Sequence, residues 1–267
     1  MKRGNKIFSI RLFNEKKAQL TIFVIIALVI IGMGLLIYTF YPDLTGTGYS
    51  KSENPEEFLK GCIQEKDIQK KINKITIQGG SMNPENTIDY YGNDVEYLCY
   101  ASDYYEQCVI QKPMLKNHVE KEIYNAIQGD IKTCINELEN SFSERGYSID
   151  MSSELIELNI IPEKIQIKLN NNIKLEKAEE TKNYDSLEIS LNSNLYEILM
   201  IATNILKWET NYGDAETTTY MTYYRDIKVE KNKLSDGTTI YKITNRDSGE
   251  KFQFASRSVA WPPGYGV

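Results

Sequence analysis

The chain has 267 residues, with 31 basic and 37 acidic side chains and a formal net charge of −6 at pH 7. Positions 1–40 hold six basic residues and one acid, so positions 41–267 keep 31 − 6 = 25 basic and 37 − 1 = 36 acidic residues, a net charge of −11. Nucleic acid and anionic headgroups both require clustered Lys and Arg. We therefore expect no binding of nucleic acid.

Residues 19–40 form a run of 22 positions without a charged side chain. A helix of that length spans the roughly 30 Å hydrocarbon layer of a bilayer and satisfies its own backbone there. The basic residues precede the run, in positions 1–18, and the first charge after it is Asp43. This asymmetry predicts a cytoplasmic arm at 1–18, a transmembrane helix at 19–40 in the lipid bilayer, and a single-pass cell-membrane protein with an extracellular carboxyl-terminal domain.

The apolar run is longer than the centre of about 7 to 15 residues found in removable signal peptides, so an uncleaved signal anchor is the first interpretation. The second is processing after Ala18, because Lys17-Ala18-Gln19 resembles the cleavage site of archaeal type IV prepilins. Phe23 stands where many pilins carry Glu, and Pro42 interrupts a long continuous helix. Assembly into a pilin-like filament is therefore the less favoured alternative.

All four cysteines follow the apolar run, and an even count outside the cell predicts two disulfides. Four cysteines allow three pairings. Cys99 and Cys108 lie in two short strand-like pieces, so a hairpin favours their pairing, and Cys62 then pairs with Cys134, each on a predicted helix. A four-Cys zinc site is disfavoured because the sequence has no Cys-x-x-Cys step and a single histidine. We expect no cofactor and no metal.

The segment 41–53 is interpreted as a linker, after which an exported domain begins. Its first helix is predicted to start at an Asn54 cap and to end at Gly79-Gly80. Short tyrosine-rich strands are predicted within 87–110. Apolar residues then recur at steps of four and three from 119 to 142, which predicts a second helix, capped by Asn117 with Glu120 and ended by Gly146.

After Gly146 the apolar period changes to two, which predicts an antiparallel meander. Its strands are expected at 147–151, 155–159, 165–169, 173–176 and 187–191. A third helix capped near Ser193 follows, and then strands at 217–229, 239–244 and 251–255. The fold class predicted for 54–257 is α+β, with three amphipathic helices packed on antiparallel sheet. A Pro/Gly/aromatic tail at 258–267 is expected to dock on its own domain or on a partner, or to be disordered.

Several segments occur in an order that resembles a known group of proteins. These are the Lys-x-Gln-x-Thr-Ile-Phe start at Lys17, the Cys62 helix ending in Gln78-Gly79-Gly80, the Cys134 helix followed by Gly146, Tyr241-Lys242-Ile243-Thr244, and Phe252-Gln253-Phe254-Ala255. Over residues 16–257 the chain resembles uncharacterised membrane-anchored envelope proteins of small-genome (DPANN-type) archaea. The resemblance implies an envelope location and no particular activity. The additional Cys99 and Cys108 pair departs from that pattern.

Catalytic patterns are largely missing from the sequence. The single histidine, His118, falls at a helix start and is interpreted as a solvated surface residue. The sequence has no Gly-x-Ser-x-Gly, His-Glu-x-x-His, phosphate-loop or dinucleotide-binding motif, so enzymatic activity is disfavoured. A secreted hydrolase with two catalytic carboxylates is the third hypothesis, although sequence spacing selects no pair of acids.

Tyrosine is abundant, with 19 residues that cluster at 90–105 and at 212–224. Half-buried strand positions are the preferred explanation, and a surface for protein or carbohydrate recognition is the alternative. The leading hypothesis is a single-pass membrane-anchored cell-envelope protein with a disulfide-stabilised exported domain for structural or recognition contacts. The sequence names no ligand and no oligomeric state.

Overall fold

A computed structural model describes residues 23–33, 52–65, 68–151, 156–170 and 173–262. The chain divides into two compact units, residues 1–48 and residues 49–267. In the first unit the described residues 23–33 form a helix. Within the described ranges no helix has both the length and the apolar character needed to cross a membrane. Several predicted segments lie outside the described residues. They are the arm at 1–18 with Lys17 and Ala18, the rest of the span at 19–40, which includes Gln19, and most of the linker.

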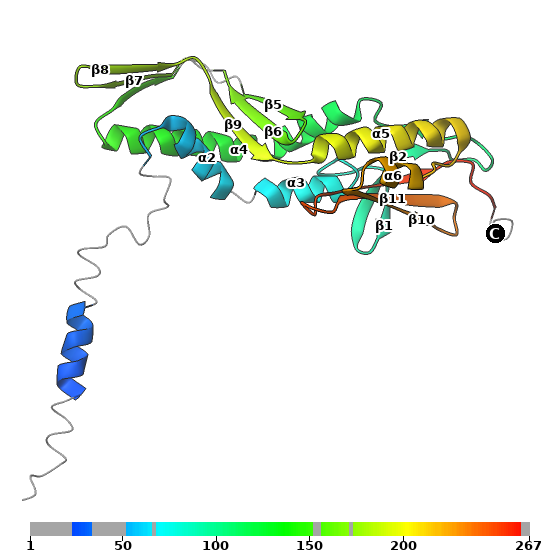
Figure 1. Cartoon of the computed structure of the whole chain (residues 1–267), viewed down its shortest axis with the longest axis horizontal. Coiled ribbons are helices and arrows are strands. Elements are labelled where there is room, and N and C mark those ends of the chain that lie inside the picture. Colours follow the sequence, from blue (N-terminus) through cyan, green and yellow to red (C-terminus); the bar gives the residue numbers. More distant parts are fainter. Residues whose placement is uncertain (1–22, 34–51, 66–67, 152–155, 171–172, 263–267) are drawn as a thin grey trace, which may run out of the picture. The chain divides into compact units, whose positions relative to one another are not determined.

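The second unit is α+β, as the sequence predicts, and its described part contains five helices instead of three. The helices are α2 Pro55–Glu65, α3 Ile68–Ile77, α4 Leu115–Glu144, α5 Leu195–Tyr212 and α6 Thr218–Tyr223 (Figure 1). The strands are β1 Thr87–Tyr90, β2 Asn93–Tyr100, β3 Val109–Ile110, β4 Ser148–Met151, β5 Ile156–Ile161, β6 Lys164–Leu169, β7 Ile173–Lys177, β8 Glu180–Tyr184, β9 Leu187–Asn192, β10 Ile227–Lys233, β11 Thr238–Asn245 and β12 Lys251–Arg257.

The largest sheet has the strand order β1-β2-β12-β11-β10, with β3 paired to β2. Strand β12 runs parallel to β2, with Ala255 opposite Tyr97, so the prediction of a purely antiparallel sheet is wrong. Helices α3 and α5 both pack on β12. Phe252 and Phe254 of β12 belong to the main core that these helices share, whereas Ala255 belongs to a small second cluster with Tyr97. The alternation along β12 therefore fixes which side of the sheet the helices cover.

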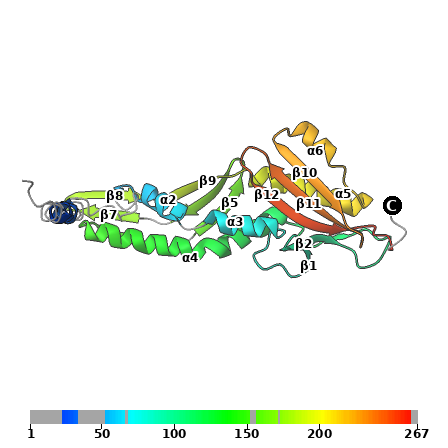
Figure 2. The same ribbon diagram turned by 90° about the horizontal axis from the view of Figure 1, so that it is seen from below.

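The predicted meander is also wrong, because its strands divide between two small sheets, β4-β7-β8 and β5-β6-β9. The chain forms the β5–β6 hairpin, crosses to the other sheet for β7 and β8, and returns as β9 to pair with β6. Strand β8 escaped prediction because its sequence, Glu-Thr-Lys-Asn-Tyr, has no apolar alternation. The long helix α4 contacts β4, β5 and α5 and extends along the unit (Figure 2).

Two helix predictions and one strand prediction need correction. The helix predicted from Asn54 to Gly79 is two helices, α2 and α3. Helix α4 begins at Leu115 without a side-chain cap, and Glu120, expected in a capping pair with Asn117, is buried and accepts a hydrogen bond from the Ile160 backbone N–H at 2.7 Å. The start of the strand predicted at 217–229 is instead helix α6. Its Thr218 N–H donates a hydrogen bond to the Glu216 carboxylate at 2.8 Å.

Two disulfides fasten this unit, with the pairing that the sequence favours. Cys62 of α2 is joined to Cys134 of α4, with a Cα–Cα distance of 5.8 Å. Cys99 of β2 is joined to Cys108, with a Cα–Cα distance of 5.3 Å. The first bond holds α2 against α4, and the second closes the short loop between β2 and β3.

Candidate functional site

Three chain segments meet where helix α5 ends, at the right of Figure 1. They are the loop 101–107, the end of α5 at 208–212, and the segment 257–261 that follows β12. The Gln107 side-chain amide donates to the Asn211 carbonyl at 2.7 Å. The Val259 N–H donates to the Glu106 carbonyl at 2.7 Å, and the Tyr105 N–H donates to the Ala260 carbonyl at 2.9 Å. Hydrogen bonds therefore hold together segments that lie more than 100 positions apart.

Five aromatic side chains on these segments are exposed. We call them the aromatic tip: Tyr104, Tyr105, Trp208, Tyr212 and Trp261, which are between 42% and 68% exposed. The Tyr105 and Trp261 rings meet edge to face with centroids 5.1 Å apart. The Trp208 and Tyr212 rings, one helical turn apart on α5, lie 4.8 Å apart with an interplanar angle of 36°. Both tryptophans of the chain are in this tip.

The loop that carries Tyr104 and Tyr105 is held at both ends. The Cys99–Cys108 disulfide closes it. The Arg257 guanidinium donates to the Ala101 carbonyl and, at 3.0 Å, to the Ser102 carbonyl, and it lies 5.2 Å from the Tyr104 ring centroid. Such a cation over an aromatic face adds a modest attraction. The exposed rings are thus presented on a constrained loop.

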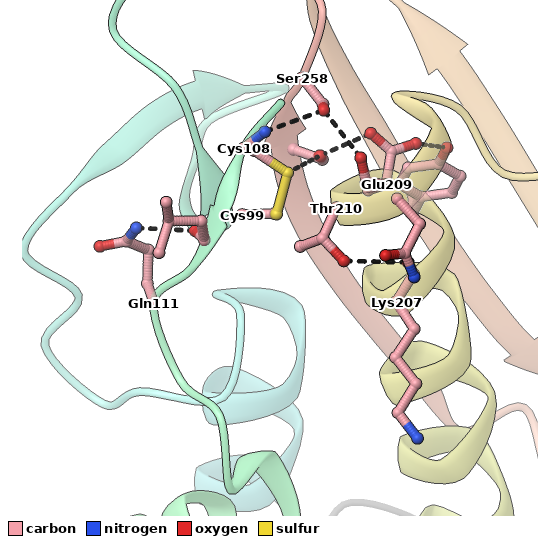
Figure 3. The surroundings of a disulfide bond; sticks show 11 residues. Cys99, Cys108, Gln111, Lys207, Glu209, Thr210 and Ser258 are labelled. Atoms are coloured by element: carbon pink, nitrogen blue, oxygen red, sulfur yellow. Dashed lines mark hydrogen bonds between the residues drawn. A yellow bond between two sulfur atoms is a disulfide. The ribbon is translucent and has the colours of Figure 1, made fainter. Parts of the chain in front are cut away.

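A buried polar network lies behind this loop (Figure 3). Glu209 of α5 is only 1% exposed, and its carboxylate accepts hydrogen bonds from the Tyr241 hydroxyl and, at 2.8 Å, from the Ser256 hydroxyl. The Ser258 hydroxyl donates to the Glu209 carbonyl at 2.8 Å and accepts the Cys108 N–H at 3.1 Å. Burial raises the pKa of Glu209, and the hydrogen bonds from Tyr241 and Ser256 offset part of that effect.

A polar groove of about 310 Å³ opens elsewhere in the unit, and its lining includes Glu163 and Glu250. The Glu250 oxygens accept hydrogen bonds from the Ser193 hydroxyl at 2.6 Å and from the Asn194 N–H at 2.5 Å. This carboxylate therefore satisfies donors at the start of α5, near the predicted Ser193 cap. That contact explains Glu250 as a helix-capping group and gives no support to the hydrolase hypothesis.

His118 is half-buried, in contrast to the solvated position expected from the sequence. Its Nε2 lies 2.9 Å from the hydroxyl of buried Ser81, which in turn lies 2.5 Å from the Glu96 carboxylate. A hydroxyl has one proton, so Ser81 donates to Glu96 and accepts from His118. In a Ser-His-acid triad the histidine stands between the other two groups, so this arrangement is not a triad. Burial lowers the pKa of His118, and the nearby positive charge of Lys112 lowers it further.

Glu137 lies beside the Cys62–Cys134 disulfide, with its Oε2 3.3 Å from the Cys62 sulfur. The three side chains are close enough to surround an ion. Zinc binds cysteine as the thiolate, however, and both sulfur atoms are committed to the disulfide. This group is therefore a structural cross-link.

The tyrosine clusters noted in the sequence separate into buried and exposed members. Tyr97 is buried in the sheet, in keeping with the preferred explanation, whereas Tyr104, Tyr105 and Tyr212 belong to the tip. Sequence reasoning missed Trp208, whose signal is its place four residues before Tyr212 and outside the apolar stripe of α5. The tail from 258 docks on its own domain as far as Ala260, and residues 263–267 lie outside the described residues.

No family model, curated protein or solved structure matches this chain. The geometry of the described residues points to the aromatic tip as the candidate functional site.

Proposed function

We propose that this protein is a single-pass, membrane-anchored cell-envelope protein whose second unit is exported and makes recognition contacts through the aromatic tip. The uncharged run at 19–40 and the basic residues before it support the anchor and its orientation. The two disulfides support an oxidising environment for the second unit. The resemblance to envelope proteins of small-genome archaea is consistent with this location.

The observation that carries the recognition role is the exposure of both tryptophans on constrained segments. Trp and Tyr are the residues most enriched at binding hot spots, because they bring a large contact area with few rotatable bonds. The disulfide and the Arg257 contacts already order the loop, so binding would cost little additional conformational entropy.

Topology is tested on intact cells that express the full chain. A protein-modifying reagent that cannot cross the bilayer should label the second unit and leave residues 1–18 unlabelled. Labelling of 1–18 with protection of the second unit would contradict the proposal. Mass spectrometry of the same material distinguishes the anchor from the pilin-like alternative, because processing after Ala18 removes residues 1–18 from the mature chain.

Recognition is tested with the detergent-solubilised full chain and isolated envelope fractions of the host cell. The double variant Trp208→Ala/Trp261→Ala should lose binding that the unmodified chain shows. Tyr223→Ala is the matched control, because Tyr223 is 80% exposed and is not part of the tip. Equal binding by all three proteins would exclude the aromatic tip as the recognition surface.

A further inference from the structure

We infer that the aromatic tip binds a neutral polysaccharide, with sugar rings stacked on Trp208 and Trp261. This inference rests on the proposed function and names the class of partner. Sugars whose ring substituents are equatorial present a face of C–H groups, and the face of an aromatic ring carries the negative lobe of its quadrupole. Exposed indole rings are well suited to pack against such a sugar face.

Two amide side chains on the tip segments match the hydroxyl groups of a sugar. They belong to Gln107 and Asn211, and each uses an amide nitrogen in a hydrogen bond to a backbone carbonyl, Gln107 to Asn211 and Asn211 to Lys207. A primary amide has two N–H donors and a carbonyl acceptor, so each side chain retains hydrogen-bonding capacity. Sites for polar small ligands combine apolar contact surface with a few such groups.

Charge selects a neutral polysaccharide over an acidic one. The loop 101–107 contains Asp103 and Glu106 and no basic residue, and positions 41–267 carry a net charge of −11 from 25 basic and 36 acidic residues. The end of α5 and the segment after β12 contribute Lys207 and Arg257. These two positive charges only balance Asp103 and Glu106, so the tip offers no net attraction to an acidic polymer, and the net negative charge of positions 41–267 opposes its approach.

The side-chain chemistry of the tip suits a sugar partner. The five members of the tip are all Tyr or Trp, whose rings combine an apolar face with a polar group at the edge. The tip therefore offers flat rings with polar edges, which suit the C–H face and the hydroxyl groups of a sugar. The binding experiment with periodate-oxidised envelope fractions distinguishes a protein partner from a sugar.

Tryptophan fluorescence tests the inference directly, because both tryptophans of the chain lie in the tip. The full chain is held in a detergent without a sugar headgroup and titrated with chitohexaose and cellohexaose. We expect a saturable blue shift of the emission with at least one of them. Trp208→Ala and Trp261→Ala should each weaken binding by about thirtyfold or more, the loss typical of a hot-spot residue. Tyr223→Ala should bind as the unmodified chain does, and polygalacturonate should give no shift.

The inference is overturned if neither oligosaccharide shifts the emission, or if polygalacturonate binds more tightly than both. Binding to envelope fractions before and after periodate oxidation of their sugars separates this inference from the proposed function. Loss of tip-dependent binding after oxidation supports a polysaccharide partner. Tip-dependent binding that survives oxidation indicates a protein partner and overturns the inference alone. Binding that never depends on the two tryptophans overturns both.

Discussion

Cys108 and Ser258 are joined by a hydrogen bond of 3.1 Å from the Cys108 N–H to the Ser258 hydroxyl. The same hydroxyl donates to the Glu209 carbonyl at 2.8 Å. One buried hydroxyl therefore connects the three segments that form the aromatic tip, and Figure 3 shows it between the disulfide and α5.

Ser258→Ala should destabilise the protein by about 1–3 kcal/mol, because the buried Cys108 N–H loses its partner and cannot reach water. Thr210→Ala, on the neighbouring helix α5, is the matched control. The Thr210 hydroxyl donates to the Lys207 carbonyl at an exposed position, so its removal should change the free energy of unfolding by about 0.5 kcal/mol or less. Denaturant titration of both variants measures the difference. Similar losses for both variants would refute a special role for Ser258.

The two disulfides should contribute differently to the stability of the fold and to binding at the tip. They link residues 72 and 9 positions apart, and loop-closure entropy gives about 4.5 kcal/mol for the longer loop and about 2.5 kcal/mol for the shorter one. Cys62→Ala/Cys134→Ala should therefore lower the denaturant midpoint more than Cys99→Ala/Cys108→Ala does. For binding at the tip we expect the opposite order. Cys99→Ala/Cys108→Ala should weaken binding more than Cys62→Ala/Cys134→Ala does, because only the shorter loop carries Tyr104 and Tyr105. A shorter-loop variant that binds normally would show that the disulfide is not needed to order the rings.

Stability at low pH should depend on Glu209. Its pKa in the folded protein is raised by burial, so its neutral form is the one that the fold favours. This contribution is complete below the unfolded-state pKa of about 4.5 and is lost as pH rises through the folded-state value. Glu209→Gln should remove this loss, because the amide is neutral at every pH. The free energy of unfolding, measured across pH 4 to 8, should fall less steeply with rising pH in the variant than in the unmodified protein.

His118 should act in the opposite direction. Its pKa in the folded protein is lowered, so the stability linked to its neutral form is present above the unfolded-state pKa of about 6.5 and is lost as pH falls through the folded-state value. Glu96, Glu122, Lys112 and Lys121 also act on this ring. His118→Gln keeps an N–H donor for Ser81 and has no titrating ring. The variant should retain more stability than the unmodified protein on acidification below about pH 6.5. If the free energy of unfolding of the two proteins changes with pH in the same way, His118 is not the cause of the acid-dependent loss of stability.

Local patterns in the sequence predict those parts of the fold that depend on neighbouring residues. The apolar steps from Val119 to Phe142 mark the buried face of α4, and Gly146, predicted to end that helix, follows its last residue closely and has positive φ. The pairing of β12 with β2 joins residues such as Ala255 and Tyr97, which are 158 positions apart (255 − 97). Alternation tells which face of a strand is buried but not which strand lies next to it.

The candidate site escaped prediction for the same reason. The sequence shows that Tyr104 and Tyr105 follow a strand and that Trp261 precedes Pro-Pro-Gly. It does not show that both segments meet the end of α5, since that depends on hydrogen bonds such as Gln107 to Asn211. His118 was misplaced because its partners, Ser81 and Glu96, come from a loop and a strand far earlier in the chain.

Gly213 and Gly249 form a matched pair that isolates one contact in the tip. Both have φ near 74°, a conformation that costs a residue with a Cβ roughly 1 kcal/mol or more. A Cβ at Gly249 would meet nothing within 4 Å, whereas one at Gly213 would lie 2.8 Å from the Val259 Cβ and closer still to its methyl group. Gly249→Ala should therefore show the backbone cost alone. Gly213→Ala should lose about 1–3 kcal/mol more, because the side chains overlap.

The same pair tests whether the segment after β12 positions Trp261. To relieve the overlap in Gly213→Ala, Val259 has to move, and Trp261 follows it two residues later. The tryptophan emission and the binding of the tip should then change in Gly213→Ala and remain as in the unmodified chain in Gly249→Ala. If both variants lose stability equally and keep the same emission, the Val259 contact plays no part in holding the tip together.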